Sequence, residues 1–225
     1  NINPAAFVDN LFQTHLYTGS SGSKTITNNI DFSNKGGLLW IKNREATQSH
    51  YLFDTERGAG KGLRTNGDFA EYDYGSSSGF NHQFTSTGFS FNTSDGAVNN
   101  GDDFVSWSFR KQPKFFDVVT YTGDNTSNRA ISHNLGSTPG MIICKSTSSG
   151  QWGVWHRSLS GNNGLRLDST AAAGGSLLHD SSTVNSTSFE VSSGGYVLDN
   201  QNQDYVAYLF AHNNNDGGFG EPGDQ

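Results

Sequence analysis

Two short glycine-rich motifs of the 225-residue chain have the residue types of known catalytic loops. Gly75-Ser76-Ser77-Ser78-Gly79 has the spacing of a hydrolase nucleophile elbow, which requires a sharp turn between a buried strand and a helix. The residues around it are small and polar, so a flexible loop explains the motif better. Gly58-Ala59-Gly60-Lys61-Gly62 lacks the spacing of a phosphate-binding loop and indicates a hairpin turn before the next strand.

The histidines and acidic residues form no catalytic or metal-binding pattern. The seven histidines are dispersed, and none stands at metal-ligand spacing from another His or Cys. A surface loop explains the pair His179-Asp180 better than a general base with its orienting acid does. Glycoside hydrolysis needs two carboxylates held across a sugar. The acids of the right type are Glu56, Glu71, Asp73, Asp102 and Asp103. Nothing selects a pair among them, so we predict no catalytic residues, no metal ligands and no enzyme activity.

Two oxygen-rich segments could bind calcium, because hard cations prefer oxygen ligands. They are Asn99-Asn100-Gly101-Asp102-Asp103 and Asp199-Asn200-Gln201-Asn202-Gln203-Asp204. The same residue types favour turns between strands, and the EF-hand order is absent. We therefore expect turns and no cofactor, with calcium as the open alternative.

One segment has the composition of a glycan-binding loop. Asp68-Phe69-Ala70-Glu71-Tyr72-Asp73-Tyr74 mixes aromatic rings, which stack on sugar faces, with carboxylates, which accept hydrogen bonds from hydroxyls. The second half of the chain has no aromatic equivalent. We predict Asp68, Tyr72, Asp73 and Tyr74 as ligand-binding residues. The alternative is an edge strand or a crossover with outward-pointing tyrosines.

Composition excludes several partners. The net charge of −7 and the isoelectric point near 5.4 argue against nucleic-acid phosphates and anionic membranes, which need clustered Lys and Arg. No apolar run approaches the ~18 residues of a membrane span. Cys144 is the one cysteine and lies in an apolar run, which predicts a small core residue. The chain begins at Asn1 rather than Met, which is compatible with a piece of a longer protein.

The sequence elements that must position these residues occur twice in the chain. Apolar runs and turn residues recur about 100 residues later, and the small length changes fall between the runs, in loops. The matched segments are Tyr17-Thr18-Gly19 with Tyr121-Thr122-Gly123, Gly37–Lys42 with Gly140–Lys145, Gly62–Arg64 with Gly164–Arg166, Thr87–Phe91 with Thr187–Val191, and Asp103–Phe109 with Asp204–Phe210. The pairs preserve the class of side chain more than its identity, which is what packing requires.

Composition and spacing predict an all-β fold. Aromatic residues make up 12% of the chain and glycines number 28, which favours short strands joined by tight turns. In the first unit we expect seven strands near 11–18, 24–30, 38–43, 50–54, 62–65, 87–92 and 103–110. Seven antiparallel strands in about 100 residues indicate a β-sandwich of jelly-roll or lectin-like type. The expected domains are 1–113 and 114–213, with a Gly-rich linker or tail at 214–225. Two separate sandwiches and one pseudo-symmetric body both remain open.

The apolar pattern of two strands in each unit predicts which residues lie in the core. Leu38–Ile41 and Met141–Cys144 are apolar on both faces, which predicts central strands. In the last strand of each unit, large apolar residues alternate, and we expect them to point inward. These inward sets are Val105, Trp107 and Phe109 in the first unit, and Val206, Tyr208 and Phe210 in the second.

Several short motifs follow one another in a fixed order along the chain. They include Leu39–Arg44, Leu52–Gly58, Phe116–Gly123, Ser132–Gly136, Pro139–Ile142, Trp155–Leu159 and Tyr205–His212. This ordered series resembles a repeated domain of unknown function found in virion and tail-fibre-like proteins of marine and cyanobacterial tailed phages. The second unit departs from Phe53-Asp54-Thr55-Glu56-Arg57-Gly58 by having Trp155-His156-Arg157-Ser158-Leu159-Ser160, so a ligand contact there need not be shared.

The resemblance implies a non-enzymatic virion protein, in a tail fibre, spike or particle surface, that presents loops for host attachment. Its partners would then be other virion proteins and a host-surface glycan, with no nucleic acid and no membrane insertion. A homo-oligomer is expected, a trimer if the protein is a fibre. The alternatives are a lectin-like glycan-binding receptor module and a polysaccharide depolymerase.

Overall fold

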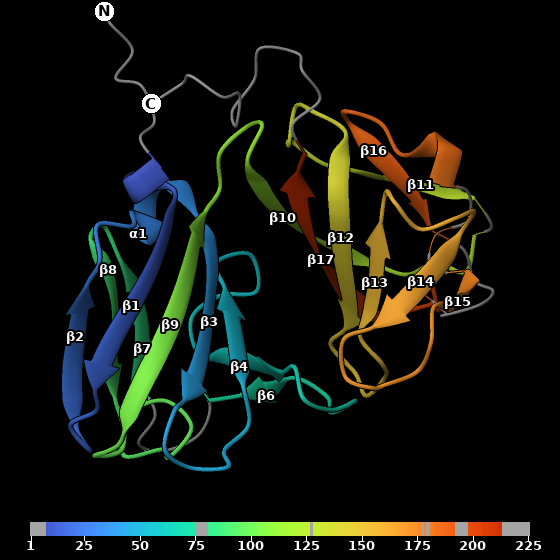
Figure 1. Cartoon of the computed structure of the whole chain (residues 1–225). Coiled ribbons are helices and arrows are strands. Elements are labelled where there is room, and N and C mark those ends of the chain that lie inside the picture. Colours follow the sequence, from blue (N-terminus) through green and yellow to red (C-terminus); the bar gives the residue numbers. More distant parts are fainter. Residues whose placement is uncertain are drawn as a thin grey trace, which may run out of the picture. The chain divides into compact units, whose positions relative to one another are not determined.

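The computed structural model describes residues 8–74, 81–126, 128–176, 178, 181–191 and 198–212. The fold is all-β, with antiparallel sheets and short helical turns (Figure 1). The chain forms two compact units. Unit 1 comprises Asn1–Gly62 and Tyr72–Lys111, and unit 2 comprises Leu63–Glu71 and Gln112–Asp224. The domain limits expected from the sequence stay predictions. In the described part of the chain, no helix has the length and apolarity needed to cross a bilayer.

Unit 1 is built on one six-stranded sheet and one three-stranded sheet. The large sheet has the order β1 (Phe12–Thr18), β9 (Asp103–Arg110), β3 (Gly37–Asn43), β4 (Tyr51–Asp54), β5 (Lys61–Arg64) and β6 (Tyr72–Asp73). The small sheet has the order β2 (Ser23–Thr27), β8 (Gly88–Asn92) and β7 (Asn81–Thr85). The 3₁₀ turn η1 (Val8–Asn10) precedes β1, and the single helical turn α1 (Phe32–Lys35) follows β2.

Unit 2 also has a large and a small sheet. The large sheet has the order β10 (Phe116–Thr122), β17 (Asp204–Ala211), β12 (Pro139–Ser146), β13 (Gly153–His156), β14 (Asn163–Arg166) and β15 (Gly174–Ser176). The small sheet consists of β11 (Arg129–Ser132) and β16 (Ser188–Val191), and the 3₁₀ turn η2 (Ser181–Thr183) precedes β16.

The repeat seen in the sequence is present in the strand order. Matching the strands by chain position turns the order of the large sheet of unit 1 into that of unit 2. The register agrees as well, since Trp40 lies opposite Trp107 and the matched Ile143 lies opposite Tyr208. As predicted, β3 and β12 are central strands. The jelly-roll or lectin-like assignment stays a prediction.

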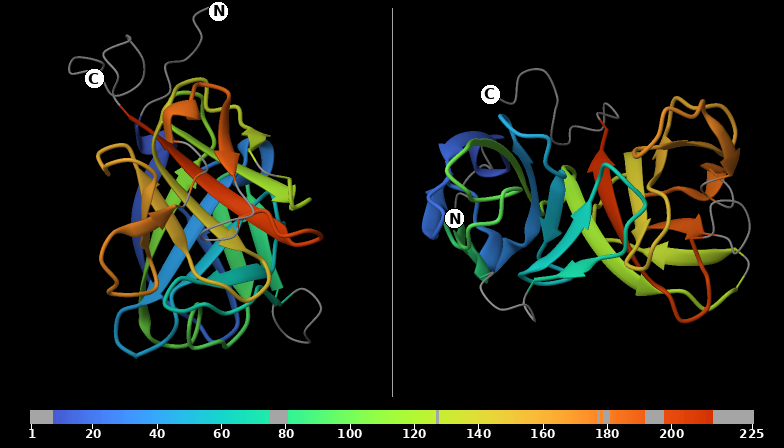
Figure 2. Two further views of the ribbon diagram at one scale, coloured as in Figure 1. Left: turned by 90° about the vertical axis from the view of Figure 1, so that its right-hand side faces the viewer. Right: turned by 90° about the horizontal axis from the view of Figure 1, so that it is seen from below.

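The core of each unit lies between its two sheets, which makes both units β-sandwich-like (Figure 2). In unit 1, Leu39 and Ile41 of β3 pack in one cluster with Phe89 and Phe91 of β8. Apolar residues of β12, β16 and β17 form the corresponding cluster of unit 2. It contains the fully buried Cys144, as expected, and burial raises the pKa of this thiol to about 12.

The residues predicted to point inward from β9 and β17 do not belong to the core clusters, although Val105, Val206 and Tyr208 are buried. Residue Phe104 belongs to the core cluster of unit 1, and Ser106 and Ser108 lie opposite core residues of β3. In β17 the core residues are Tyr205, Ala207 and Leu209. The predicted residues lie on the other face of their strands: Val105, Trp107 and Phe109, and Val206, Tyr208 and Phe210. The prediction assumed that the larger side chains of each strand point into the core. Small residues such as Ser106 and Ser108 suffice there, because the neighbouring residues Ile41 and Leu39 of β3 fill the space.

The Tyr-Thr-Gly motif of unit 1 ties the end of β1 to the segment before β9. The Tyr17 ring stacks on Phe104 with 5.2 Å between centroids, and its hydroxyl donates to the buried carbonyl of Val98 at 2.7 Å. The hydroxyl of Thr18 donates to the carboxylate of Asp103. A Cβ at Gly19 would lie 1.7 Å from the carbonyl oxygen of Asn100, so only glycine fits there.

Unit 2 repeats each of these contacts. The Tyr121 ring stacks on Tyr205 at 5.1 Å, and its hydroxyl donates to the carbonyl of Leu198 at 2.9 Å. The hydroxyl of Thr122 donates to Asp204, and a Cβ at Gly123 would lie 2.0 Å from the carbonyl oxygen of Asn200. We call this set of contacts the Tyr-Thr-Gly clip. Its presence in both units explains why the motif recurs.

The core of unit 1 contains a histidine that is held neutral. His82 is 2% exposed, stacks on Phe91 at 4.9 Å and lies 4.8 Å from the ring of Phe53. Its Nδ1 accepts a hydrogen bond from the amide of Gly60. Burial lowers the pKa of His82 to about 3. The unfolded chain binds a proton at this residue near pH 6.5, so acid favours unfolding over the window between these values.

We expect the free energy of unfolding of the protein to fall by about 2 kcal/mol from His82 alone between pH 7 and pH 5. The variant His82→Phe should lack this part of the pH dependence, because an aromatic ring remains and the proton site is gone. Denaturant titrations of both proteins at pH 7 and pH 5 measure the difference. Equal losses of stability in the two proteins would contradict the buried, neutral histidine.

Candidate functional site

Of the predicted ligand-binding residues, Tyr72 and Tyr74 lie together, with 4.3 Å between their ring centroids. Asp68 is exposed and belongs to unit 2, where its carbonyl accepts a hydrogen bond from the amide of Gly150 at 2.7 Å. Tyr72 and Asp73 are exposed and belong to unit 1. Tyr74 is 6% exposed and packs in the core of unit 1, so its ring presents no face to a ligand. The segment therefore splits between two compact units.

Two aromatic rings of this segment are exposed. Tyr72 is 42% exposed and lies on β6, the edge strand of the large sheet, as the alternative interpretation of the segment expected. Phe69, which sequence analysis did not select, is 46% exposed, and the guanidinium of Arg64 lies 4.5 Å from its ring centroid. Tyr72, which was predicted, and Phe69, which was not, are the exposed aromatic residues of the segment Asp68–Tyr74.

The oxygen-rich segment of unit 1 uses its polar groups within the protein. Asn99 is fully buried; its Oδ1 accepts from the amide of Ser20, and its Nδ2 donates to the carbonyls of Gly22 and Thr93. The carboxylate of Asp102 accepts from the side-chain amides of Asn43 and Asn100. These bonds lower the pKa of Asp102 below its usual value. The segment is therefore a turn that is held by side-chain hydrogen bonds.

In unit 2 a buried ion pair takes the corresponding place. Asp199 is fully buried and accepts hydrogen bonds from the amides of Asp124 and Thr126. The guanidinium of Arg129 donates to Asp199 at 3.0 Å and to the carbonyl of Thr122. Among the residues that the structure describes, no three His, Cys, Asp or Glu side chains gather in a group that could hold a metal ion.

Of the remaining chemical motifs, the structure describes one. Gly58 and Gly60 have positive φ angles and form the turn before β5, as the hairpin interpretation expected. Gly75-Ser76-Ser77-Ser78-Gly79 and His179-Asp180 lie outside the described residues.

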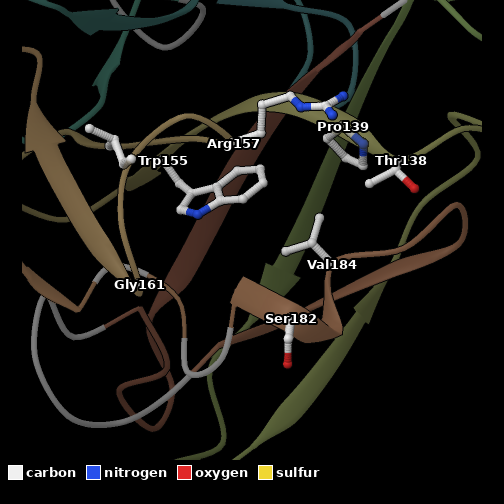
Figure 3. A pocket seen from close by; sticks show the side chains of 8 residues that line it. Thr138, Pro139, Trp155, Arg157, Gly161, Ser182 and Val184 are labelled. Carbon is white, nitrogen blue, oxygen red and sulfur yellow. The ribbon is translucent and has the colours of Figure 1, made fainter. Parts of the chain in front are cut away.

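Unit 2 has a pocket of about 440 Å³. It lies at Trp155–Ser160, the segment in which the sequence of unit 2 departs from that of unit 1. Its walls come from the start of β12, the end of β13 with the following loop, and the segment around η2 (Figure 3). The lining residues are Thr138, Pro139, Trp155, Arg157, Leu159, Gly161, Ser182 and Val184. In Figure 3 the indole of Trp155 lies between Arg157 on one side and Val184 and Ser182 on the other.

In the described part of unit 1, the position that matches Trp155 is packed with aromatic rings. Trp155 lies opposite Ile142, and the matched position of unit 1 is Phe53, which lies opposite Leu39. In unit 1, β7 adds a third strand to the small sheet and brings His82 against Phe53. In the described part of unit 2, the small sheet has two strands, and the short turn η2 precedes β16.

The described lining of the pocket combines polar and apolar side chains. Trp155 is 4% exposed, and its Nε1 is buried without a hydrogen-bond partner. Among the described lining residues, Arg157 is the charged one, and Thr138 and Ser182 supply hydroxyls. Pro139, Leu159 and Val184 form the apolar part of the wall.

The ion pair of Asp199 and Arg129 yields a test with an internal reference, because unit 1 has the neutral Asn99 at the matched position. Replacing Arg129 by Leu leaves a buried carboxylate unpaired, and we expect a loss of about 2–3 kcal/mol in the free energy of unfolding. Asp199→Asn should cost less than about 1 kcal/mol. The double variant should recover most of the loss, which a double-mutant cycle measures by chemical denaturation. If Arg129→Leu costs no more than Asp199→Asn, the ion pair does not have this role.

Comparison with known proteins gives one family and no characterised relative. The family model named "Domain of unknown function (DUF7483)" matches residues 8–221 and therefore spans both units. No curated protein and no solved structure matches the chain. Because the match covers almost the whole sequence, the chain belongs to the DUF7483 family of domains of unknown function.

Proposed function

We propose that this chain is a non-enzymatic structural and adhesive protein of a virion, in a tail fibre, a spike or on the particle surface, with loops that attach to a host. The observation that carries the proposal is the Tyr-Thr-Gly clip, which occurs in both units and fixes the loops at one end of each sandwich. Loops on a rigid scaffold can be presented with a constant shape, and binding residues concentrate on such loops.

The virion setting rests on the resemblance of the sequence phrases given above. It makes other virion proteins the partners and a homo-oligomer the expected assembly, a trimer if the protein is a fibre. A non-enzymatic role is part of the proposal, because the sequence offers no catalytic pattern of residues.

A lectin-like receptor module is the second candidate, and two observations favour it. The exposed rings of Tyr72 and Phe69 could each stack on a sugar, and the pocket beside Trp155 has the size of a small-molecule site. A polysaccharide depolymerase has less support, because it requires two carboxylates across the bond to be cleaved.

Two measurements on the whole chain test the proposal. Electron microscopy of virus particles labelled with antibody against the chain should show it on the tail or particle surface. In a second measurement, the purified chain with a fluorescent label should bind host cells or their surface polysaccharide without releasing reducing sugar. Tyr72→Ala should weaken this binding, while Leu167→Ala, a change at a similarly exposed apolar residue, serves as the control. Unlabelled particles, or catalytic release of sugar, would contradict the proposal.

A further inference from the structure

We infer that strand β1 of unit 1 is an interface between two copies of this chain, in which the two β1 strands pair antiparallel about a two-fold axis at His15. The inference names the contact for the homo-oligomer of the proposed function, and it rests on that proposal for its biological setting only. The open edge of β1, its lack of protective residues and its exposed apolar side chain carry the argument.

The first step is that β1 has an open edge. It is the end strand of the large sheet of unit 1, and its one neighbour among the described strands is β9 (Figure 1). The carbonyl of Leu11, just before β1, accepts a hydrogen bond from the amide of Arg110. The amide of Gly19, just after β1, donates to the carbonyl of Asp102.

These two bonds show which backbone groups form the open edge. In an antiparallel pair, the residues that bond to one neighbour alternate with those that face the other side. The odd-numbered residues of β1 therefore bond to β9, and the even-numbered ones direct their N–H and C=O groups away from it. The outward-directed residues are Phe12, Thr14, Leu16 and Thr18.

The second step is the lack of protection. Exposed sheet edges recruit further strands, and proteins protect such edges with charged residues, proline or bulges. Strand β1 contains no Asp, Glu, Lys, Arg or Pro, and its register with β9 runs over all seven residues without a shift. In unit 2 the matched strand β10 is protected at its start, because Gln112 exchanges two backbone hydrogen bonds with Phe116. The edge of β1 has no such cover in the described part of the chain.

The third step is the apolar surface beside the edge. Leu16 is 59% exposed, the highest value among the exposed large apolar residues that the structure describes. It shares a face of β1 with Phe12, and the residues opposite them on β9 are Val105 and Phe109. The rings of Phe12 and Phe109 are half-buried and lie 4.7 Å apart between centroids. A further strand beside β1 would extend this face and remove Leu16 from water.

The fourth step is that β1 is complementary to itself. When the strand is reversed onto a second copy over its full length, the two-fold axis passes at the middle residue. The facing pairs are His15 with His15, Thr14 with Leu16, and Phe12 with Thr18. All outward-directed backbone groups then meet outward-directed groups, so each gains a hydrogen-bond partner. The strand brings no Asp, Glu, Lys or Arg opposite a like charge, and a second copy of this chain therefore fits the edge.

Sedimentation equilibrium of the whole purified chain tests the inference. We expect a reversible dimer, with twice the 24.3 kDa mass of the chain, at micromolar concentration. His15→Lys places two like charges opposite each other at the axis, so the dissociation constant should rise at least about tenfold. His15→Thr, an uncharged change at the same half-buried residue, is the control and should remain dimeric. A monomer, a trimer, or a dimer that His15→Lys leaves unchanged would overturn the inference, and circular dichroism verifies that the variants fold.

Introduced cysteines test the register. Facing residues that share no hydrogen bond have Cα atoms about 4.5 Å apart, a distance that a disulfide can bridge. His15→Cys should therefore form a disulfide-linked dimer on mild oxidation. Gln13→Cys, which would lie opposite Tyr17 of the second copy, is the control and should cross-link at least about tenfold more slowly. The native Cys144 is fully buried.

Equal cross-linking of the two cysteine variants would contradict an axis at His15. Both experiments use the purified chain in solution, so their results are independent of whether the chain lies on a virion. A monomer in solution would overturn this interface and leave the virion proposal to the labelling of particles.

Discussion

The structure of each unit depends on the hydrogen bond between a tyrosine at the end of its first strand and a backbone carbonyl before its last strand. Tyr17 and Tyr121 end the first strand of their units, and each donates from its hydroxyl to the segment that leads into the last strand. Since the first and last strands are neighbours in the large sheet, this bond and the stacked ring close the sandwich at one end. Burial raises the pKa of both tyrosines, so both hydroxyls remain donors over the physiological range.

The clip also explains residues that sequence analysis had considered for calcium. The close approach of the chain at Gly19 and Gly123 brings the backbone amides of one loop onto Asn99 and Asp199 of the other. In unit 1 the buried acceptor is the neutral amide of Asn99. In unit 2 it is the carboxylate of Asp199, whose charge is paired with Arg129. The same backbone geometry therefore tolerates two different charge states.

Short sequence patterns predicted those parts of the fold that depend on neighbouring residues in the chain. The apolar runs at β3 and β12 identified the central strands, and the repeated Tyr-Thr-Gly motif identified the duplication. The short strand β7 was not predicted, since its apolar alternation is interrupted by His82. The two-residue strand β6 was expected only as the edge-strand alternative to a ligand-binding loop. The sequence did not identify which face of β9 and β17 joins the core clusters, because both faces of these strands carry buried apolar residues.

The pocket could not be predicted from the sequence, although one signal pointed to it. The departure of Trp155-His156-Arg157 from Phe53-Asp54-Thr55 marked the place where the copies diverge. Whether a divergence creates a cavity depends on what covers the strand, and that is set by β7 in unit 1 and by the turn η2 in unit 2. For Tyr74, the sequence supplied an aromatic ring in a polar segment, and only the tertiary structure placed that ring in the core.

The most direct test of the duplicated clip is the stability of Tyr17→Phe and Tyr121→Phe, which remove one hydroxyl each and keep the stacked rings. Each change leaves a carbonyl without its donor, at Val98 in unit 1 and Leu198 in unit 2. We predict that chemical denaturation of the whole chain shows a similar loss of about 1–3 kcal/mol for both variants. A variant as stable as the unchanged protein would contradict the account that one hydrogen bond closes both sandwiches.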